Sequence, residues 1–202
     1  PTYTLHVDPR THIVRPATDG DLPAAASLAS ALVRYHHARD PRRYAILADP
    51  LEPGYERFLR SQLADPDAVV LVAEACGGDG APSGRIVGYA LGSVEPRDWM
   101  LLLDGAGWIH DLIVDERERG QGIGEALARA MIDILRQRGA PRIVLMTIHD
   151  DHARRLYERI GFRPTLLRFL TLQVQGSDEG RRTLALLRHQ LFARGVPPRG
   201  AI

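Results

Sequence analysis

The chain of 202 residues is long enough for one sizeable hydrophobic core, and its 45% hydrophobic and 25% charged residues are ordinary for a soluble globular protein. Its formal net charge of +1 excludes a general attraction to nucleic acid or to an anionic membrane. Cys76 is the only cysteine, which excludes an internal disulfide and favours a reducing, cytoplasmic location. Neither a signal peptide nor a membrane-spanning stretch is expected. The sequence lacks lysine and asparagine, which we interpret as the coding bias of a GC-rich, bacterial genome.

The N-terminal half predicts an arm, a strand, two helices and a pair of strands. Thr18 and Asp21 form a Thr-x-x-Asp helix start, and apolar residues then recur every three to four positions. Asp40 and Pro41 break this helix, and a proline-rich loop over residues 39–53 follows. In chain order, the expected elements are residues 1–11, His12–Arg15, Thr18–His37, Glu52–Ala64, Ala68–Cys76 and Arg85–Val94.

The second half predicts strands that alternate with helices. A loop, Glu95–Ala106, comes first, and a glycine stop followed by Pro141 ends the long helix that opens at Gly124. The continuous apolar run Ile143–Ile148 predicts a strand covered on both faces. Asp150 or Asp151 is expected to cap the short helix. The expected elements are Trp108–Val114, Gly124–Gly139, Ile143–Ile148, Ala153–Ile160, Leu166–Val174 and Asp178–Ala193.

The order β-α-α-β-β-β-α-β-α-β plus a C-terminal helix predicts one α/β (mixed α+β) domain, with a central mixed, twisted sheet flanked by helices. We expect this domain to span residues 12–175, between the arm and a helical appendage over residues 176–202. The leucine face of the appendage could build a homodimer interface or pack on its own domain.

A glycine-spaced loop, Arg119–Gly124, joins the strand Trp108–Val114 to the long helix. Glycines let backbone N–H groups approach a ligand, and the first N–H groups of a helix lack internal partners, so the loop suits a phosphate or pyrophosphate. A Walker A loop would need Lys and Ser or Thr after its last glycine, where Glu125 and Ala126 stand. A Rossmann fingerprint would need GxGxxG directly after the strand. A glycine-rich turn without a ligand remains the alternative.

Two motifs in order resemble those of the GCN5-related N-acetyltransferase family, GNAT. The glycine loop matches its Arg/Gln-x-x-Gly-x-Gly/Ala pattern at every fixed position. Further along, Ala153, Tyr157, Gly161 and Phe162 match the family's Asn-x-x-Ala-x-x-x-Tyr-x-x-x-Gly-Phe in register. Asp150 stands where the family usually has asparagine. The resemblance spans about residues 12–174.

The resemblance implies a bulge in the strand Trp108–Val114 and a gap between that strand and Ile143–Ile148. Acetyl-CoA would lie in this gap as cosubstrate, with no metal involved. Its pantetheine arm would contact Leu112, Ile113 and Val114. Its pyrophosphate would lie on the glycine loop, and the later motif would add two further contacts. These implied binding residues are Arg119, Gly120, Gln121, Gly122, Ile123, Gly124, Asp150 and Ala153.

The implied reaction is direct attack of a neutral amine on the thioester. Tyr157 is the natural acid for the departing thiolate, with packing under the sheet as its alternative. His110 is the leading base because it titrates near neutrality and matches the catalytic histidine of serotonin N-acetyltransferase by position. Glu95 is the next candidate, and water could also serve. Asp111 should point to the opposite face unless the bulge redirects it.

Seven residues are candidates for acceptor recognition, with a plain surface role as the alternative for each. Two end the first helix, His36 and His37, and five lie in the flanking loops, Asp40, Arg42, Tyr44, Asp98 and Trp99. We expect an acetyl-CoA-dependent N-acetyltransferase acting on the primary amine of a small molecule. The alternatives are acetylation of a protein or peptide amine, and a CoA-binding sensor without catalysis. No nucleic-acid or membrane partner is expected.

Overall fold

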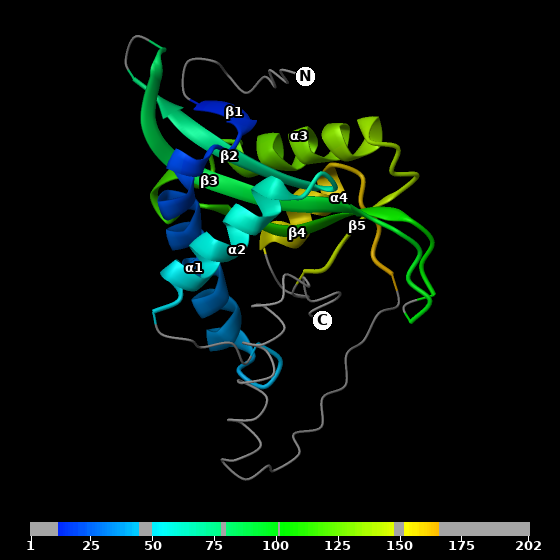
Figure 1. The fold of residues 1–202 in the computed structure, drawn as a ribbon. Helices are drawn as coiled ribbons and strands as arrows, with labels where there is room; N and C mark the ends of the chain where they lie inside the picture. Colours follow the sequence, from blue (N-terminus) through cyan, green and yellow to red (C-terminus); the bar gives the residue numbers. More distant parts are fainter. Residues whose placement is uncertain (1–11, 45–49, 78–79, 101, 148–151, 166–202) are drawn as a thin grey trace. The chain divides into compact units, whose positions relative to one another are not determined.

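The computed structural model describes residues 12–44, 50–77, 80–100, 102–147 and 152–165. They form a five-stranded sheet in the order β1-β2-β3-β4-β5, with helices on both faces (Figure 1). The predicted mixed α/β fold is confirmed through the short helix α4. The elements are β1 (His12–Pro16), α1 (Leu22–Arg39), α2 (Glu52–Ala64), β2 (Ala68–Cys76), β3 (Pro82–Glu95), β4 (Ala106–Val114), α3 (Ile123–Gln137), β5 (Ile143–Leu145) and α4 (His152–Arg159), with 3-10 turns at Asp19–Asp21 and Glu116–Glu118.

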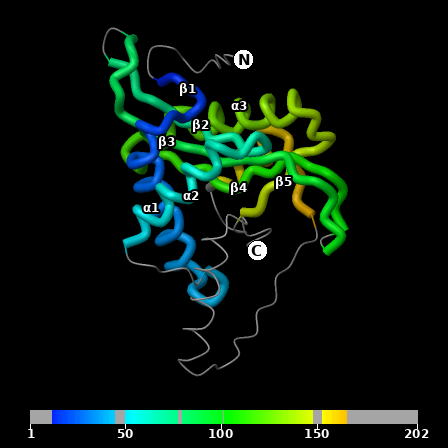
Figure 2. Tube along the Cα trace, viewed as in Figure 1, coloured from blue at the N-terminus to red at the C-terminus, as the bar shows by residue number. Residues whose placement is uncertain are grey.

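The sheet is mixed because one of its four strand pairings is parallel. β1 to β4 run antiparallel to their neighbours, and the β2–β3 and β3–β4 hairpins project from opposite ends of the sheet (Figure 2). β4 and β5 are parallel and pair over three residues only, ending at Ile109 opposite Leu145. Within the described residues, β4 therefore continues to Val114 without a partner strand on that edge.

The two faces of the sheet are covered by different helices. α3 presents one face of its 3.6-residue period, and buries Leu127, Met131 and Ile134 against one side of the sheet. α1 and α2 cover the other side, where Leu22, Leu59 and Tyr89 belong to a second cluster. The sheet is thus a middle layer between two apolar clusters, and its strand ends position the site.

Most predicted boundaries agree with the structure to within three residues, and two differences stand out. The first is that β5 ends at Leu145 and is only half-buried, although Ile143–Ile148 was predicted to be covered on both faces. β5 lies at the end of the described sheet and pairs there with β4 alone, so its cover is incomplete. The second is that β3 starts at Pro82, before the predicted start at Arg85. The strand Leu166–Val174, the helix Asp178–Ala193 and the boundary at residue 176 lie outside the described residues.

Candidate active site

A β-bulge in β4 organises the site. Opposite β3, the register runs from Leu91 paired with Asp111 to Gly92 paired with Ile109, so His110 is an extra residue with no partner. Side chains of a regular strand alternate between the two faces, and one extra residue shifts this alternation. The bulge that the family resemblance implied is therefore present, and it lies at the residue predicted to be the base.

The shift turns two successive side chains toward the same face of the sheet. Tyr89 and Ser93 lie on the α1/α2 face of β3, four residues apart in a regular strand. Asp111 accepts a hydrogen bond from the Tyr89 hydroxyl, and His110 is hydrogen-bonded to Ser93. The bulge thus redirects Asp111, and a regular pleat would have sent it to the opposite face.

Gly92 lets the bulge and α3 come this close together. A Cβ atom built on Gly92 would lie 2.7 Å from the carbonyl oxygen of Trp108 and 2.6 Å from the sulfur of Met131. The first of these atoms is backbone and cannot move aside cheaply. Glycine is therefore required here by close approach, a reason that strand propensity does not reveal.

A surface hollow, which we call the β4 hollow, lies along the unpaired edge of β4. Its lining comes from α1, the loop after α1, β4, the end of β5 and α4. The residues that line it are Leu32, His36, Tyr44, Ile109, His110, Asp111, Leu112, Met146, Thr147, Ala153 and Tyr157. The structure therefore brings the predicted acid and the predicted base to one hollow, together with Ala153 and two of the suggested acceptor residues.

His110 is the end of a short hydrogen-bonded chain. Its Nε2 lies 2.6 Å from Ser93 Oγ, and Ser93 donates to Glu95 Oε1, also at 2.6 Å. Because the serine hydroxyl has one proton and gives it to Glu95, Nε2 is the donor to Ser93 in this arrangement. The ring is stacked parallel to Trp108, with centroids 6.2 Å apart. The imidazole of His110, whose Nε2 lies 3.8 Å from Glu95 Oε1, holds the pKa of Glu95 below its usual value, so Glu95 is a carboxylate beside the imidazole.

Asp111 lies in a more enclosed setting than His110. Its Oδ2 accepts from the hydroxyls of Tyr89 and Tyr55, the latter at 3.4 Å. Burial raises the pKa of Asp111, and the two tyrosine hydroxyls and the nearby His110 and His36 oppose this rise only in part. Burial also raises the pKa of Tyr89, so this phenol stays protonated and donates.

Tyr157 lies on the buried side of α4. Only 8% of its surface is exposed, and its ring packs edge-on against Phe162 with centroids 5.7 Å apart. The packing role that was the alternative for this residue is therefore real. It fixes the ring beside the β4 hollow, so packing and a chemical role do not exclude each other here.

The glycine loop has the geometry that an anion site needs. Gly120 and Gly122 have φ angles of 81° and 82°, and a Cβ at either would meet no atom within 4 Å. Gly122 is the N-cap of α3, so the free N–H groups of the first helical turn open directly at the loop. Arg119 is half-exposed and folds back to donate from Nε to the carbonyl of Val114, at 3.3 Å. Open backbone at the start of a helix is the kind of geometry that suits an anion.

The remaining residues predicted to bind the cosubstrate lie in different surroundings. Ile113 and Ile123 bury their side chains in the two apolar clusters, and Ile113 is paired with Tyr89 of β3. Leu112 and Val114 pack beside the α3 cluster and continue the unpaired edge of β4. Gln121 donates to Glu118 at 3.0 Å. Asp150 lies outside the described residues.

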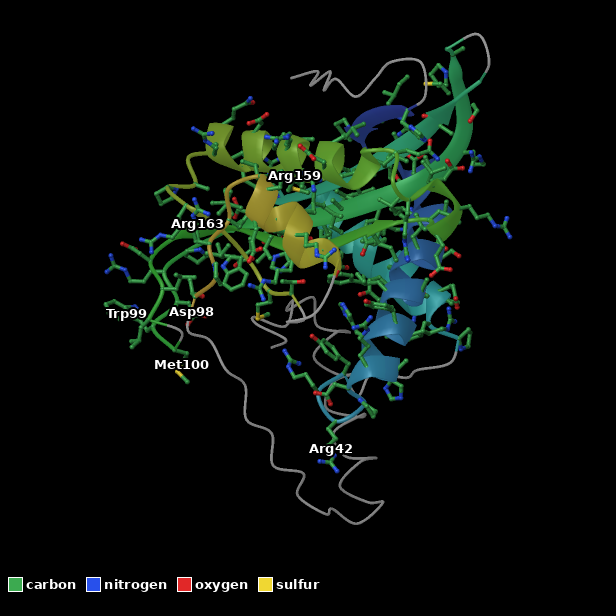
Figure 3. The ribbon with its side chains drawn as sticks, turned by 180° about the vertical axis from the view of Figure 1, so that it is seen from behind. Arg42, Asp98, Trp99, Met100, Arg159 and Arg163 are labelled. Atoms are coloured by element: carbon green, nitrogen blue, oxygen red, sulfur yellow. The ribbon has the colours of Figure 1, made fainter. Side chains whose placement is uncertain are left out.

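Four of the suggested acceptor residues form two separate pairs. His36 and Tyr44 stack at 4.7 Å between centroids and form one wall of the β4 hollow. Asp98 and Trp99 lie at the tip of the β3–β4 hairpin, in a separate hollow, where Trp99 is 74% exposed. Figure 3 shows this tip well away from Arg42, which lies in the loop after α1.

Sequence reasoning missed Ser93, Tyr55 and Tyr89, and also the apolar lining from Leu32 and Met146. The pattern of apolar and polar residues gave no sign of Tyr55 or Tyr89, because both look like ordinary core residues in a helix and a strand. Ser93 could have been found from its position two residues before Glu95, on the same face of the predicted strand.

The described residues contain neither a cluster of metal-ligating side chains nor a helix suited to a membrane. Across 12–44, 50–77, 80–100, 102–147 and 152–165, no three His, Cys, Asp or Glu side chains gather as metal ligands would. In the same ranges, no helix has the length and apolar character needed to cross a bilayer.

Comparison with known proteins identifies the family. The profile of the acetyltransferase (GNAT) family matches residues 31–162. The chain is 34% identical over 82 residues to glucosamine 6-phosphate N-acetyltransferase of Trypanosoma brucei brucei, and 30% identical over 82 residues to spermine/spermidine N(1)-acetyltransferase of Bacillus subtilis. These stretches are 41% and 40% of this chain, and the chain spans about half, 54%, of each relative.

Solved structures of acetyltransferases have the same fold. A predicted acetyltransferase of Clostridium acetobutylicum, whose crystal structure contains acetyl-CoA, superposes with a TM-score of 0.57 at 19% identity, over 80% of this chain and 96% of that one. Proteins with this fold use acetyl-CoA as cosubstrate. The family profile covers well over half of the chain, and the bulged β4 and the glycine loop before α3 agree with it. The chain therefore belongs to the acetyltransferase (GNAT) family.

Proposed function

We propose that the protein transfers the acetyl group of acetyl-CoA to the primary amine of a small molecule. The observation that carries the proposal is the β4 hollow, where the bulge brings His110 and its hydrogen-bonded chain to the same cavity as Tyr157. The hollow adjoins the unpaired edge of β4, and that edge leads to the glycine loop. A thioester that extends along this edge from a pyrophosphate on the loop would present its carbonyl to both residues.

Acetyl-CoA would be held mainly by backbone groups. The pyrophosphate would accept hydrogen bonds from the N–H groups of the glycine loop and the first turn of α3, while the half-exposed guanidinium of Arg119 adds positive charge. The pantetheine arm would pair with the edge of Leu112–Val114. Ala153, small and at the rim of the β4 hollow, leaves room beside it.

In the proposed reaction, His110 and Tyr157 carry the protons that are transferred. His110 Nδ1 takes a proton from the ammonium group, and the neutral amine then attacks the carbonyl carbon. The new C–N bond forms, the C–S bond breaks, and Tyr157 donates its phenolic proton to the CoA thiolate. The nitrogen then loses its second proton, which restores the phenol. The first proton leaves His110 for solvent, so each turnover yields amide, CoA thiol and one proton.

The β4 hollow favours a small acceptor over a protein or peptide chain, because the stacked His36 and Tyr44 wall it on one side. The two relatives described above are named for small amines, which supports the same choice. We place the activity in the cytoplasm of a bacterium. Association into a dimer through residues 176–202 stays a prediction.

The test is release of CoA thiol from acetyl-CoA across a panel of small amines and short peptides. Tyr157→Phe should lower kcat by about 10²-fold or more, because general acid catalysis contributes roughly 10² to 10⁴. Tyr35→Phe is the matched control, since it removes a phenol of α1 that does not line the β4 hollow. Saturable CoA binding without release for any acceptor would favour the sensor alternative. Failure to bind CoA would overturn the assignment of the glycine loop.

A further inference from the structure

We propose that Asp111 binds the positively charged amino group of the acceptor, and that the β4 hollow selects a primary ammonium carried on an apolar or aromatic body. This inference rests on the proposed function, and it goes further by assigning the chemical class of the acceptor and the residue that recognises it.

The first argument is that no arginine among the described residues is paired with Asp111. The chain has 26 arginines and no lysine, yet none of the described arginines forms an ion pair with Asp111. Buried carboxylates are costly unless they are paired, so such a site invites a charge from outside. The groups that the structure does place around Asp111 are the two tyrosine hydroxyls and the imidazoles of His110 and His36.

The second argument is the orientation of the carboxyl group. Tyr89 and Tyr55 both donate to Oδ2, and within the described residues Oδ1 accepts no hydrogen bond. Two protonated phenols on one oxygen fix the plane of the carboxyl group and leave the other oxygen available. Because Asp111 lines the β4 hollow, an ammonium group there can donate to it directly.

The third argument is the rest of the lining. Leu32, Ile109, Leu112 and Met146 are apolar, and the stacked pair of His36 and Tyr44 offers a flat ring face. Among the described residues that line the β4 hollow, none is an arginine. A phosphate-bearing acceptor would find no fixed cation in this lining, whereas an aryl or alkyl ammonium would find a carboxylate and apolar contacts.

Binding and proton transfer then fall to neighbouring residues. Asp111 holds the acceptor as the ammonium form, which predominates for alkyl amines at neutral pH. His110, the preceding residue on the same face, is adjacent to receive the proton. The bulge is what makes this division possible, because it places consecutive side chains on one face.

The test is binding without turnover. Calorimetric titrations would compare benzylamine with benzyl alcohol, its uncharged counterpart of similar shape, on the full chain saturated with CoA. Wild-type protein should bind benzylamine about tenfold more tightly than the alcohol, the scale of one hydrogen bond to a charged group. Asp111→Asn should reduce this ratio to about one and leave the alcohol affinity unchanged. Asp133→Asn, an exposed carboxyl of α3, should keep the wild-type ratio.

Two results would overturn the inference: equal binding of the amine and the alcohol to wild-type protein, or an undiminished preference in Asp111→Asn. Absence of saturable binding of both probes to wild-type protein would also overturn it. The unchanged affinity of the alcohol shows that the variant is folded. Since the titration needs no acetyl transfer, failure of the acetyltransferase proposal appears separately, in the CoA-thiol assay.

Discussion

The bulge in the middle of β4 and the loop beyond its C-terminal end build their sites in different ways. Beyond the C-terminal end, the glycine loop offers backbone N–H groups from a few consecutive residues. Because glycine has no side chain, these groups are open to a ligand. At the bulge, the β4 hollow is built from side chains that five separate segments contribute. A site made of local backbone is therefore robust and can be read from sequence, whereas a site made of distant side chains depends on the whole fold.

The largest effect is expected at the bulge. His110→Gln should lower kcat by about 10² to 10³-fold while the Kd of CoA stays unchanged, because the variant removes the base and leaves the glycine loop intact. Ser93→Ala should cost roughly tenfold, since it interrupts the chain between His110 and Glu95 without removing the imidazole. Steady-state kinetics with the best amine of the panel, together with CoA titrations, measures both. An unchanged kcat in His110→Gln would assign the base role to water or to another residue.

A smaller effect is expected at the glycine loop, and it should fall on the other substrate. Gly122→Ala should weaken CoA binding by about tenfold, because a left-handed residue with a Cβ costs roughly 1–2 kcal/mol and shifts the loop. Gly139→Ala is the matched control: Gly139 also has a positive φ, 88°, and open space around it, but it follows α3 at the opposite end. It should change the Kd of CoA less than twofold. Equal effects of the two variants on the Kd would show that the loop's conformation is not what binds CoA.

The smallest effect concerns stability. Burial raises the pKa of Asp111 above its ordinary value of 3.8, so the folded state holds this proton more tightly than the unfolded state. Below that ordinary value both states are protonated and no penalty exists. As the pH rises through the raised pKa, ionisation favours unfolding. Asp111→Asn should therefore raise Tm by roughly 2–4 °C at neutral pH, with the gain vanishing near pH 3. Thermal unfolding across this pH range checks the trend, and a lower Tm at neutral pH would contradict it.

The comparison also explains what the sequence could predict. The order of elements through α4 and the glycine loop follow from local patterns, namely the periodicity of α3 and the spacing of Gly120, Gly122 and Gly124. The family resemblance supplied the bulge, the acid and the base. Tyr157 was predicted because a motif carries it in register with Ala153.

The parts that could not be predicted depend on tertiary packing. Tyr55 and Tyr89 are separated by 34 positions in the chain, and only the packing of α2 on the sheet brings both hydroxyls to Asp111. His36 and Tyr44 were suggested as acceptor residues on the same grounds as Asp98 and Trp99. The structure separates the two pairs because the hairpin tip extends away from the loop after α1. Propensity and spacing contain no information about such long-range geometry.

The extra residue at His110 shifts the alternation of all the side chains that follow it in β4 from one face of the sheet to the other. Before it, the alternation of side chains assigns Ile109 to the α3 layer; after it, Leu112 is assigned to that same layer although the two are an odd number of residues apart. Both halves of the strand stay correctly buried, and the shift itself leaves two polar side chains adjacent on one face. A one-residue deletion at the bulge should therefore do more than remove a base. It would return the strand to an ordinary pleat and separate the two side chains on which the proposed site depends.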